Sequence, residues 1–189
     1  MTDVAVLKIE LADIRPPIWR RLVVPTALSL FDLHCVIQGA MGWTDTHLHM
    51  FAKGAARYML PEDDEDDDYL DERRFTLADL ADRKGARFDY EYDFGDGWRH
   101  RIVVEDLRQA PGEVRPHCTA GRRACPLEDC GGPYAYPEFL ATLADPTSPE
   151  DEETKEWAGD FDPEAFDIAE ANDGIAAAYR PRRGPRGGG

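Results

Sequence analysis

The sequence predicts an α+β protein with a mainly antiparallel sheet and a central β-hairpin, packed by an N-terminal helix and by C-terminal helices. Segments in which apolar and polar residues alternate recur through residues 4–105, which is typical of strands. Patterns that begin helices follow the second of these segments and return from residue 137 onwards. The hydrophobic content of 42% is sufficient for a core in a chain of 189 residues, so a single domain is expected over residues 1–179.

Two strands and a helix are expected first. Residues 4–11 and 18–24 alternate as strands do, with two prolines between them. Ser29, with Asp32 three residues later, forms a capping-box pattern, and Gly42 can end the helix in a left-handed conformation. The helix carries one apolar stripe: Leu33, Val36, Ile37, Ala40 and Met41.

Residues 47–52 alternate as a further strand, which would place His47 and His49 on one face, with His34 nearby in sequence. Two imidazoles on one face are a common metal-binding geometry. The alternative, which we favour, is a half-exposed strand face, or one histidine that is buried and hydrogen-bonded.

An acidic segment follows this strand. Residues 62–72 hold nine acidic residues and no basic one. Like charges at this density oppose packing and predict a solvated loop. The segment lacks the spacing of an EF-hand, so calcium binding is not favoured. Thr76 and Asp79 then predict a short capped helix.

Residues 86–94 and 98–105 are expected to form the central hairpin. Asp96 and Gly97 form its turn, because both residue types adopt positive φ readily. The period of two in the first strand places four aromatic residues on one apolar face. These residues are Phe88, Tyr90, Tyr92 and Phe94.

The polar residues of the hairpin support two interpretations. Asp93, Asp96 and His100 lie close along the chain, and carboxylates with an imidazole can hold a divalent cation. The favoured alternative is that the aspartates accept hydrogen bonds from turn amides while His100 is hydrogen-bonded inside the sheet. The triplet Asp93-Phe94-Gly95 also occurs in protein kinases, but the chain lacks the other kinase motifs.

Residues 106–133 are expected to be irregular and contain three of the four cysteines. Cys118, Cys125 and Cys130 could bind zinc with a histidine from elsewhere, although no CxxC motif is present. The alternative is buried thiols in an irregular segment. Glu128 and Asp129 could serve a metal. The favoured alternative is that they cap the helix that follows or stabilise the turn before it.

The C-terminal part predicts three helices: over residues 137–143, from Ser148 and Pro149, and from Asp162 towards Tyr179. The basic, Gly/Pro-rich tail at 180–189 is expected to be disordered.

The formal net charge is −16, and the tail contributes four arginines, so residues 1–179 carry −20. A field of this sign repels phosphates, which argues against nucleic acid and anionic membranes as partners and favours a basic protein or a small ligand. No secretory signal and no apolar run of membrane-spanning length occur, so a cytoplasmic location is expected.

Four segments together resemble the plasmid pRiA4b ORF-3-like family: IRPPIWRRLVVP, LHCVIQGAMGWTDTHLHMF, YEYDFGDGWRH and ACPLEDCGGPYAYPEFLATLADP. The resemblance covers about residues 4–175, and Leu127 stands where the family usually has proline. It implies a compact α+β domain without an assigned biochemical role, in a family with some mobile-element members, even putative resolvases. Recombination is not supported here, because the two serines, Ser29 and Ser148, both fall at expected helix starts.

The sequence contains clear motifs for strands, turns and helix caps, whereas its candidate catalytic motifs are weak. This contrast predicts a non-catalytic binding or interaction module. A metal-dependent hydrolase is the alternative, with metal-activated water and a carboxylate base. Its ligands would come from His47, His49, Asp93, Asp96, His100, Glu128 and Asp129.

Overall fold

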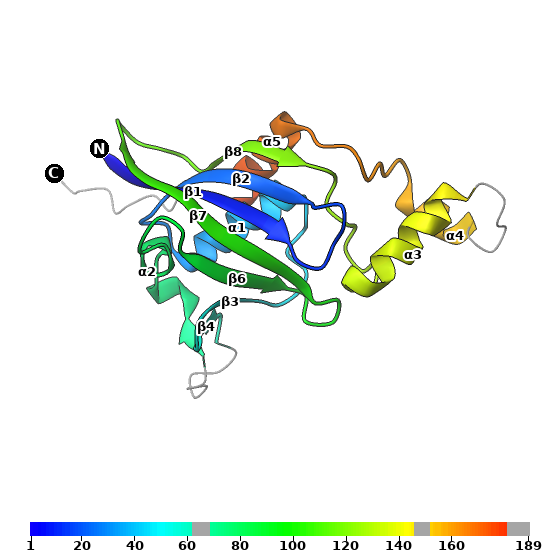
Figure 1. The fold of residues 1–189 in the computed structure, drawn as a ribbon, viewed down its shortest axis with the longest axis horizontal. Coiled ribbons are helices and arrows are strands. Elements are labelled where there is room, and N and C mark those ends of the chain that lie inside the picture. Colours follow the sequence, from blue (N-terminus) through cyan, green and yellow to red (C-terminus); the bar gives the residue numbers. More distant parts are fainter. Residues whose placement is uncertain (62–68, 146–151, 181–189) are drawn as a thin grey trace.

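The structure of the protein is a computed structural model that describes residues 1–61, 69–145 and 152–180 (Figure 1). Eight strands in these ranges form one sheet in the order β5-β4-β3-β6-β7-β1-β2-β8. All neighbouring strands are antiparallel except β4 and β5. The predicted α+β class with a mostly antiparallel sheet is therefore confirmed, and the hairpin of β6 and β7 lies centrally in the sheet.

The middle of the sheet consists of β1 (Thr2–Leu11), β2 (Trp19–Pro25), β6 (Arg87–Tyr92) and β7 (Trp98–Ala110). One side extends through β3 (His49–Lys53), β4 (Ala56–Met59) and β5 (Leu70–Asp71). On the other side, β8 (His117–Arg122) pairs with β2. The sequence predicts that residues 106–133 are irregular, but β7 continues to Ala110 and residues 117–122 form β8. Most residues of these segments are half-buried or exposed, so the apolar alternation that reveals a strand is weak there.

Helix α1 (Leu30–Met41) lies against one face of the sheet, behind the strands in Figure 1. Its predicted caps are confirmed: the Ser29 side chain accepts a hydrogen bond from the Asp32 amide, and Gly42 has φ of 87°. The expected short helix after residue 76 is also present, as α2 (Leu77–Leu80) with a capping box from Thr76 and Asp79.

Helix α5 (Ile168–Ala178) packs against α1 on the same side of the sheet. Gly39 of α1 and Gly174 of α5 meet at the crossing, where a Cβ on Gly174 would lie 2.3 Å from the Gly39 carbonyl oxygen. Only glycine permits this approach. The helix begins after Asp167, which accepts hydrogen bonds from the amides of its first turn, and not at Asp162.

The aromatic residues Phe51, Tyr90, Tyr92 and Trp98 are fully buried in the core. Phe94, predicted to belong to this face, is 45% exposed, so that prediction is wrong. Strand β6 ends at Tyr92, and Asp93 takes a φ of 58°, which turns the chain before Phe94.

The predicted acidic loop 62–72 is only partly described. Residues 62–68 lie outside the described ranges, whereas β5 and a 3₁₀ turn (Glu72–Arg74) follow directly. Glu72 is fully buried instead of solvated, and its hydrogen bond to His49 offsets the cost of burying the carboxylate.

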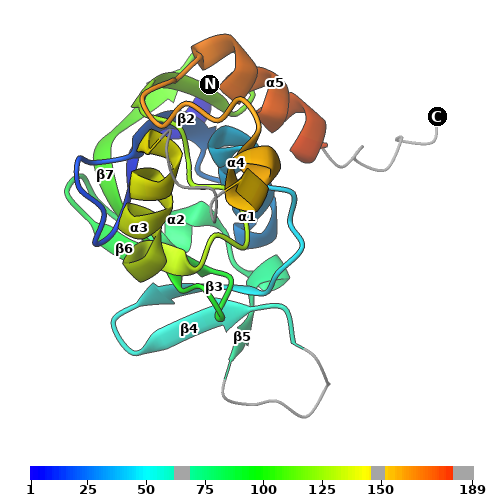
Figure 2. The ribbon, with the colours of Figure 1, turned by 90° about the vertical axis from the view of Figure 1, so that its right-hand side faces the viewer.

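Helices α3 (Gly132–Ala144) and α4 (Glu152–Ala158) pack against each other beside the sheet (Figure 1), and Figure 2 views them from their own side, in front of the strands. The expected start of a helix at Ser148 and the tail at 181–189 lie outside the described residues. No helix in the described ranges has both the length and the apolar character needed to cross a bilayer.

Gly174→Ala is expected to lower the free energy of unfolding by about 1–3 kcal/mol, because the added methyl group overpacks the α1–α5 crossing. Urea denaturation measures the change. The sign of this change is decisive, because replacing glycine with alanine in an open helix stabilises a protein by about 1 kcal/mol. A higher free energy of unfolding in Gly174→Ala would contradict the close approach of the two helices.

Candidate functional site

The turn of the central hairpin, residues 93–97, is in contact with the loop 126–132. The Gly131 amide donates to Asp96 Oδ2 at 3.1 Å. Gly132 approaches so closely that a Cβ there would lie 2.1 Å from the Asp96 carbonyl oxygen. Asp93 Oδ1 accepts from the amides of Gly95 and Asp96 at 2.9 and 3.2 Å. Asp93 therefore satisfies amides of its own turn, as the favoured interpretation expects, whereas Asp96 satisfies an amide of the neighbouring loop.

Glu128 ties the same loop to residues 43–46. Its carboxylate accepts from the amide and hydroxyl of Thr44 at 3.1 and 2.5 Å, and from the Tyr92 hydroxyl at 2.5 Å. Tyr92 also accepts a hydrogen bond from the Thr46 amide. Burial, with a further contribution from Glu128, raises the pKa of Tyr92 to about 12. Glu128 thus holds these loops together.

Three predicted candidates converge beside these contacts: His47, Asp93 and Asp129. His47 Nε2 lies 3.1 Å from Asp129 Oδ1 and 3.7 Å from Asp93 Oδ2. One ligand atom from each residue falls within 4.8 Å of the other two. The His47 Nε2 atom is buried and, although Asp129 lies within ion-pair distance, it makes no hydrogen bond of acceptable geometry to the described residues. Asp129 is 71% exposed, so the cluster opens to solvent on that side.

The 3.1 Å separation of His47 and Asp129 suits a divalent cation, whereas the 3.7 Å separation of His47 and Asp93 is a few tenths of an ångström longer than an ideal site has. With metal–ligand distances of about 2.1 Å, adjacent ligand atoms lie about 3.0 Å apart in an octahedron and about 3.4 Å apart in a tetrahedron. One imidazole and two carboxylates are ligands for ions such as Mn²⁺ and Zn²⁺. Asp93 and Asp129 both have positive φ, 58° and 62°, a conformation that aspartate tolerates better than most residues. Three protein ligands would leave coordination positions for water.

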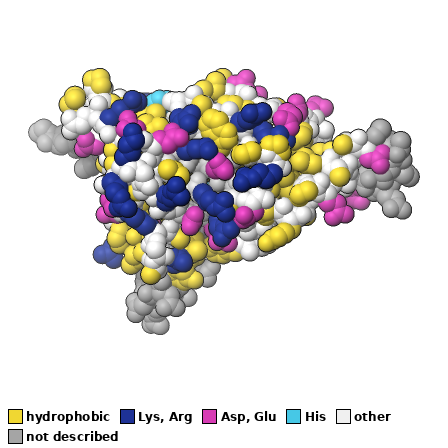
Figure 3. Space-filling model, viewed as in Figure 1, with side chains coloured by type: hydrophobic (Ala, Val, Ile, Leu, Met, Phe, Trp, Pro, Cys, Tyr) yellow, Lys and Arg dark blue, Asp and Glu magenta, His cyan; other side chains and the backbone are white. Residues whose placement is uncertain are grey.

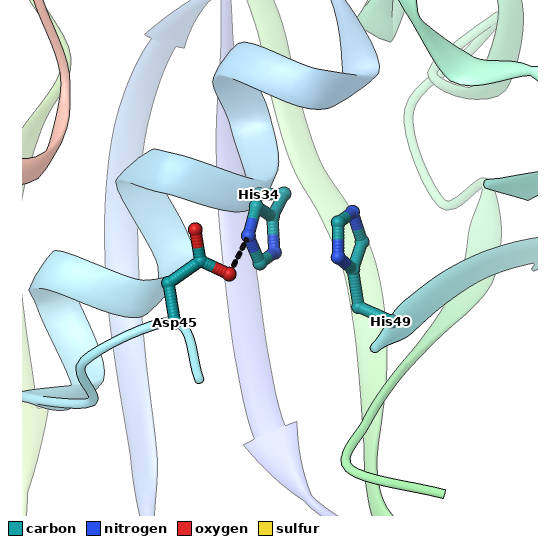
Figure 4. A group of neighbouring side chains, drawn as sticks. All are labelled: His34, Asp45 and His49. Atoms are coloured by element: carbon teal, nitrogen blue, oxygen red, sulfur yellow. Dashed lines mark hydrogen bonds and ion pairs between the residues drawn. The ribbon is translucent and has the colours of Figure 1, made fainter. Parts of the chain in front are cut away.

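A second group contains His34, Asp45 and His49 (Figure 4). The rings of His34 and His49 are stacked, with centroids 3.4 Å apart and planes 3° from parallel. A metal ion lies close to the plane of each imidazole that binds it, and two parallel planes at this separation share no position. The stacked pair is therefore unsuited to chelate one ion.

This second group belongs to a closed chain of hydrogen bonds. Gln38 Nε2 donates to the Tyr90 hydroxyl at 2.9 Å, and the Asp45 amide donates to Gln38 Oε1 at 3.1 Å. His34 Nδ1 lies 2.8 Å from the Tyr90 hydroxyl, and its Nε2 lies 2.8 Å from Asp45 Oδ1. Since Tyr90 accepts from Gln38, it donates to His34 Nδ1, and Nε2–H donates to Asp45. Burial lowers the pKa of His34 and so favours the neutral ring.

His49 contacts this network by stacking on the His34 ring, and it hydrogen-bonds on its other side to Glu72. Its Nε2 lies 3.0 and 2.9 Å from the two carboxylate oxygens of the fully buried Glu72. His47 precedes β3, whose first residue is His49, and the two histidines enter different groups. The sequence predicts that His47 and His49 share one face of a strand. In the structure, His47 lies near Asp93 and Asp129, whereas His49 lies near His34 and Glu72.

His100 belongs to neither group. It is fully buried, with Nδ1 3.3 Å from the Tyr90 carbonyl oxygen, and its ring meets the Trp43 ring edge-on. Burial lowers the pKa of His100 to about 4. This buried, neutral ring matches the structural alternative.

The three candidate zinc-binding cysteines also lie outside both groups. Cys118 is in β8 and its thiol lies 3.3 Å from the Ala120 carbonyl oxygen, while Cys125 and Cys130 are in the loop before α3. Burial raises the pKa of all three thiols, to about 12 for Cys130. Zinc binding by these cysteines stays a prediction.

Sequence reasoning did not identify the roles of Gln38, Asp45 and Glu72. One signal was present: His34 and Gln38 are four residues apart, so they share one side of α1 and can both reach Tyr90. No such signal marks Glu72, because it stands at the end of a run of acidic residues from which nothing in the sequence distinguishes it.

The fold and these clusters define a class: an α+β protein with one large sheet and a histidine–carboxylate cluster beside its central hairpin turn. The chain belongs to the plasmid pRiA4b ORF-3-like protein family, whose model matches residues 3–170.

Two relatives are uncharacterised in function. An uncharacterized protein, y4hQ, of Sinorhizobium fredii is 40% identical over 185 residues, which is 95% of each chain. A crystal structure of a protein of unknown function, MM3350 of Methanosarcina mazei Go1, matches with a TM-score of 0.80 and 37% identity, covering 90% of this chain and 98% of that one. These comparisons show the family and the fold of the chain. They assign it no activity, because the function of both relatives is unknown.

Tyr90→Phe is expected to lower the free energy of unfolding by about 1–3 kcal/mol, because it leaves His34 Nδ1 and Gln38 Nε2 without their buried partner. Chemical denaturation measures this. Tyr134→Phe is the control: Tyr134 is 96% exposed, so a change within about 0.5 kcal/mol is expected. Equal stability of both variants would contradict the network.

The buried His100 makes stability depend on pH. Its folded pKa of about 4 lies below the ordinary value of 6.5, so the unfolded chain binds the proton first as the pH falls. Stability is therefore lost as the pH decreases from 6.5 towards 4. Denaturation at pH 7 and pH 5 should show a smaller loss for His100→Gln than for the unmodified protein; identical losses would contradict a neutral buried ring.

Proposed function

We propose that this protein is a non-catalytic binding module that holds a divalent cation through His47, Asp93 and Asp129. One observation carries the proposal: His47 Nε2 is buried, makes no hydrogen bond of acceptable geometry to the described residues, and faces two carboxylates. A buried polar atom without a hydrogen bond is unfavourable, and a shared cation would satisfy it together with both acids.

The positions of the ligands support a binding role. Asp93 belongs to the hairpin turn, Asp129 to the loop before α3, and His47 to the segment before β3. The Asp93 amide donates to the Leu48 carbonyl at 2.9 Å, which fixes Asp93 beside the histidine segment. A cation bound by all three would link segments that are far apart in the sequence.

The surface charge bears on the choice of partner. Figure 3 shows Lys and Arg side chains gathered over the open face of the sheet, despite the net charge of −16. Many of them are paired with acids; Arg21 contacts Glu105, and Arg99 contacts Asp13. The proposed partner remains a basic protein or a small ligand, and a basic protein would bind away from this sheet face.

Isothermal titration with MnCl₂ and ZnCl₂ tests the cation site. One ion per chain is expected, and His47→Ala or Asp129→Asn should weaken binding by about tenfold or more, because each removes one of three ligands. Asp89→Asn is the matched control, since Asp89 is an exposed acid of β6 outside the cluster.

Equal binding by Asp129→Asn and Asp89→Asn would contradict this assignment. Loss of zinc in Cys125→Ser, with full retention in His47→Ala, would assign the ion to the cysteines instead.

A metal-dependent hydrolase is the second candidate, favoured by the 71% exposure of Asp129, which leaves the cluster accessible to a substrate. A bound metal would supply Lewis acidity and a water of lowered pKa. Metal-dependent turnover of an activated ester or phosphodiester that is lost in His47→Ala would favour this candidate; turnover unchanged in that variant would exclude the cluster as its source.

A further inference from the structure

A separate cavity of about 570 Å³ lies between the C-terminal end of α1, the loop 124–127 and residues 161–171. None of the three proposed cation ligands lines it. Its lining is mostly apolar or small and includes Met41, Leu127, Phe161 and Phe166. Ligand pockets of this size and apolar character usually hold small organic molecules, oriented by a few polar groups.

The buried polar side chain among the lining residues of this cavity is that of Arg20, which is only 4% exposed. Its Nε donates to the Ala40 carbonyl at 3.0 Å. Its Nη1 lies within 3.2 Å of the carbonyl oxygens of Trp19, Arg122 and Arg123. Within the described residues, Arg20 forms no ion pair, and its Nη2 has no hydrogen-bond partner.

A buried guanidinium without an acidic partner is unusual, because buried charges are normally paired. The Ala40 carbonyl belongs to the last turn of α1, so the partial negative charge of that helix end compensates Arg20 in part. No carboxylate supplies the remainder within the described residues. The two hydrogens of Nη2 are the donors left for a ligand.

The surroundings hold the guanidinium in place. The Phe166 ring covers it, with the guanidinium carbon 4.5 Å from the ring centroid. Gly121 makes this packing possible, because a Cβ there would lie 2.5 Å from Phe166 and 2.9 Å from Arg20 Cδ. Arg20 is therefore positioned before any ligand enters, which lowers the entropic cost of binding.

We propose that this cavity binds a small organic monocarboxylate, whose carboxylate accepts hydrogen bonds from Arg20 Nη2 and whose apolar body contacts the lining. Two exposed acids, Asp167 and Glu170, also line the cavity. Their negative charges disfavour a dianion such as a phosphate monoester more than a monoanion. The site is independent of the proposed cation site.

Protein-observed NMR with hexanoate, 1-hexanol and inorganic phosphate tests the proposal. Hexanoate should bind saturably and shift the amides of Gly39, Gly42 and Ala171, which line the cavity. Hexanol should bind at least about tenfold more weakly, since it lacks the charge-assisted hydrogen bonds to Arg20. Phosphate should cause no saturable shift at these amides. Absence of saturable hexanoate binding, hexanol binding as tightly as hexanoate, or a saturable phosphate shift at these amides would overturn the proposal.

Variants locate the site without disturbing the carbonyl contacts of Arg20. Ala165→Phe should fill the cavity and abolish hexanoate binding. Glu170→Gln should strengthen hexanoate binding by about twofold to threefold, because it removes a nearby negative charge. Asp173→Asn on the same helix is the control, since Asp173 is exposed and does not line the cavity. Unchanged binding in Ala165→Phe, or equal affinities of Glu170→Gln and Asp173→Asn, would place hexanoate elsewhere.

Discussion

The candidate cation site depends on the contact between the loop 126–132 and the turn of the central hairpin. Gly132 approaches the Asp96 carbonyl too closely for any side chain, and the Gly131 amide bonds to the Asp96 carboxylate. Glu128 extends this contact to Tyr92 and Thr44. Asp129 lies between these anchored residues, so its carboxylate is brought beside His47. The same residues that resemble the family motifs therefore create the cluster.

The segment 43–49 connects this cluster to the core. Asp45 bonds to His34 and Gln38 of α1, His47 faces Asp93 and Asp129, and His49 bonds to Glu72. Polar groups with little exposure must find partners, so the network around Tyr90 specifies how α1 and this segment sit on the sheet. A fixed segment then holds His47 where the two acids meet.

Much of the fold could be predicted because its signals are local. The alternation of β1, β2 and β6 and the caps at Ser29 and Gly42 depend on neighbouring residues. The strand β8 and the burial of Glu72 could not be predicted, because a long-range strand pairing and a distant histidine cause them. For the candidate site, the residue types and their spacing predict His47, Asp93 and Asp129 as part of a longer list of possible metal ligands. The sequence could not show that His49 and His100 lie apart from these three residues. That separation depends on the start of β3 at His49 and on the burial of both rings in the core.

The proposed cation site is tested most directly by a crystal structure of the protein with Mn²⁺, measured for anomalous scattering. One strong anomalous peak is expected, about 2.0–2.3 Å from His47 Nε2 and from a carboxylate oxygen of both Asp93 and Asp129. A peak at other residues, or no peak at saturating Mn²⁺, would contradict the assignment of this cluster as a cation site.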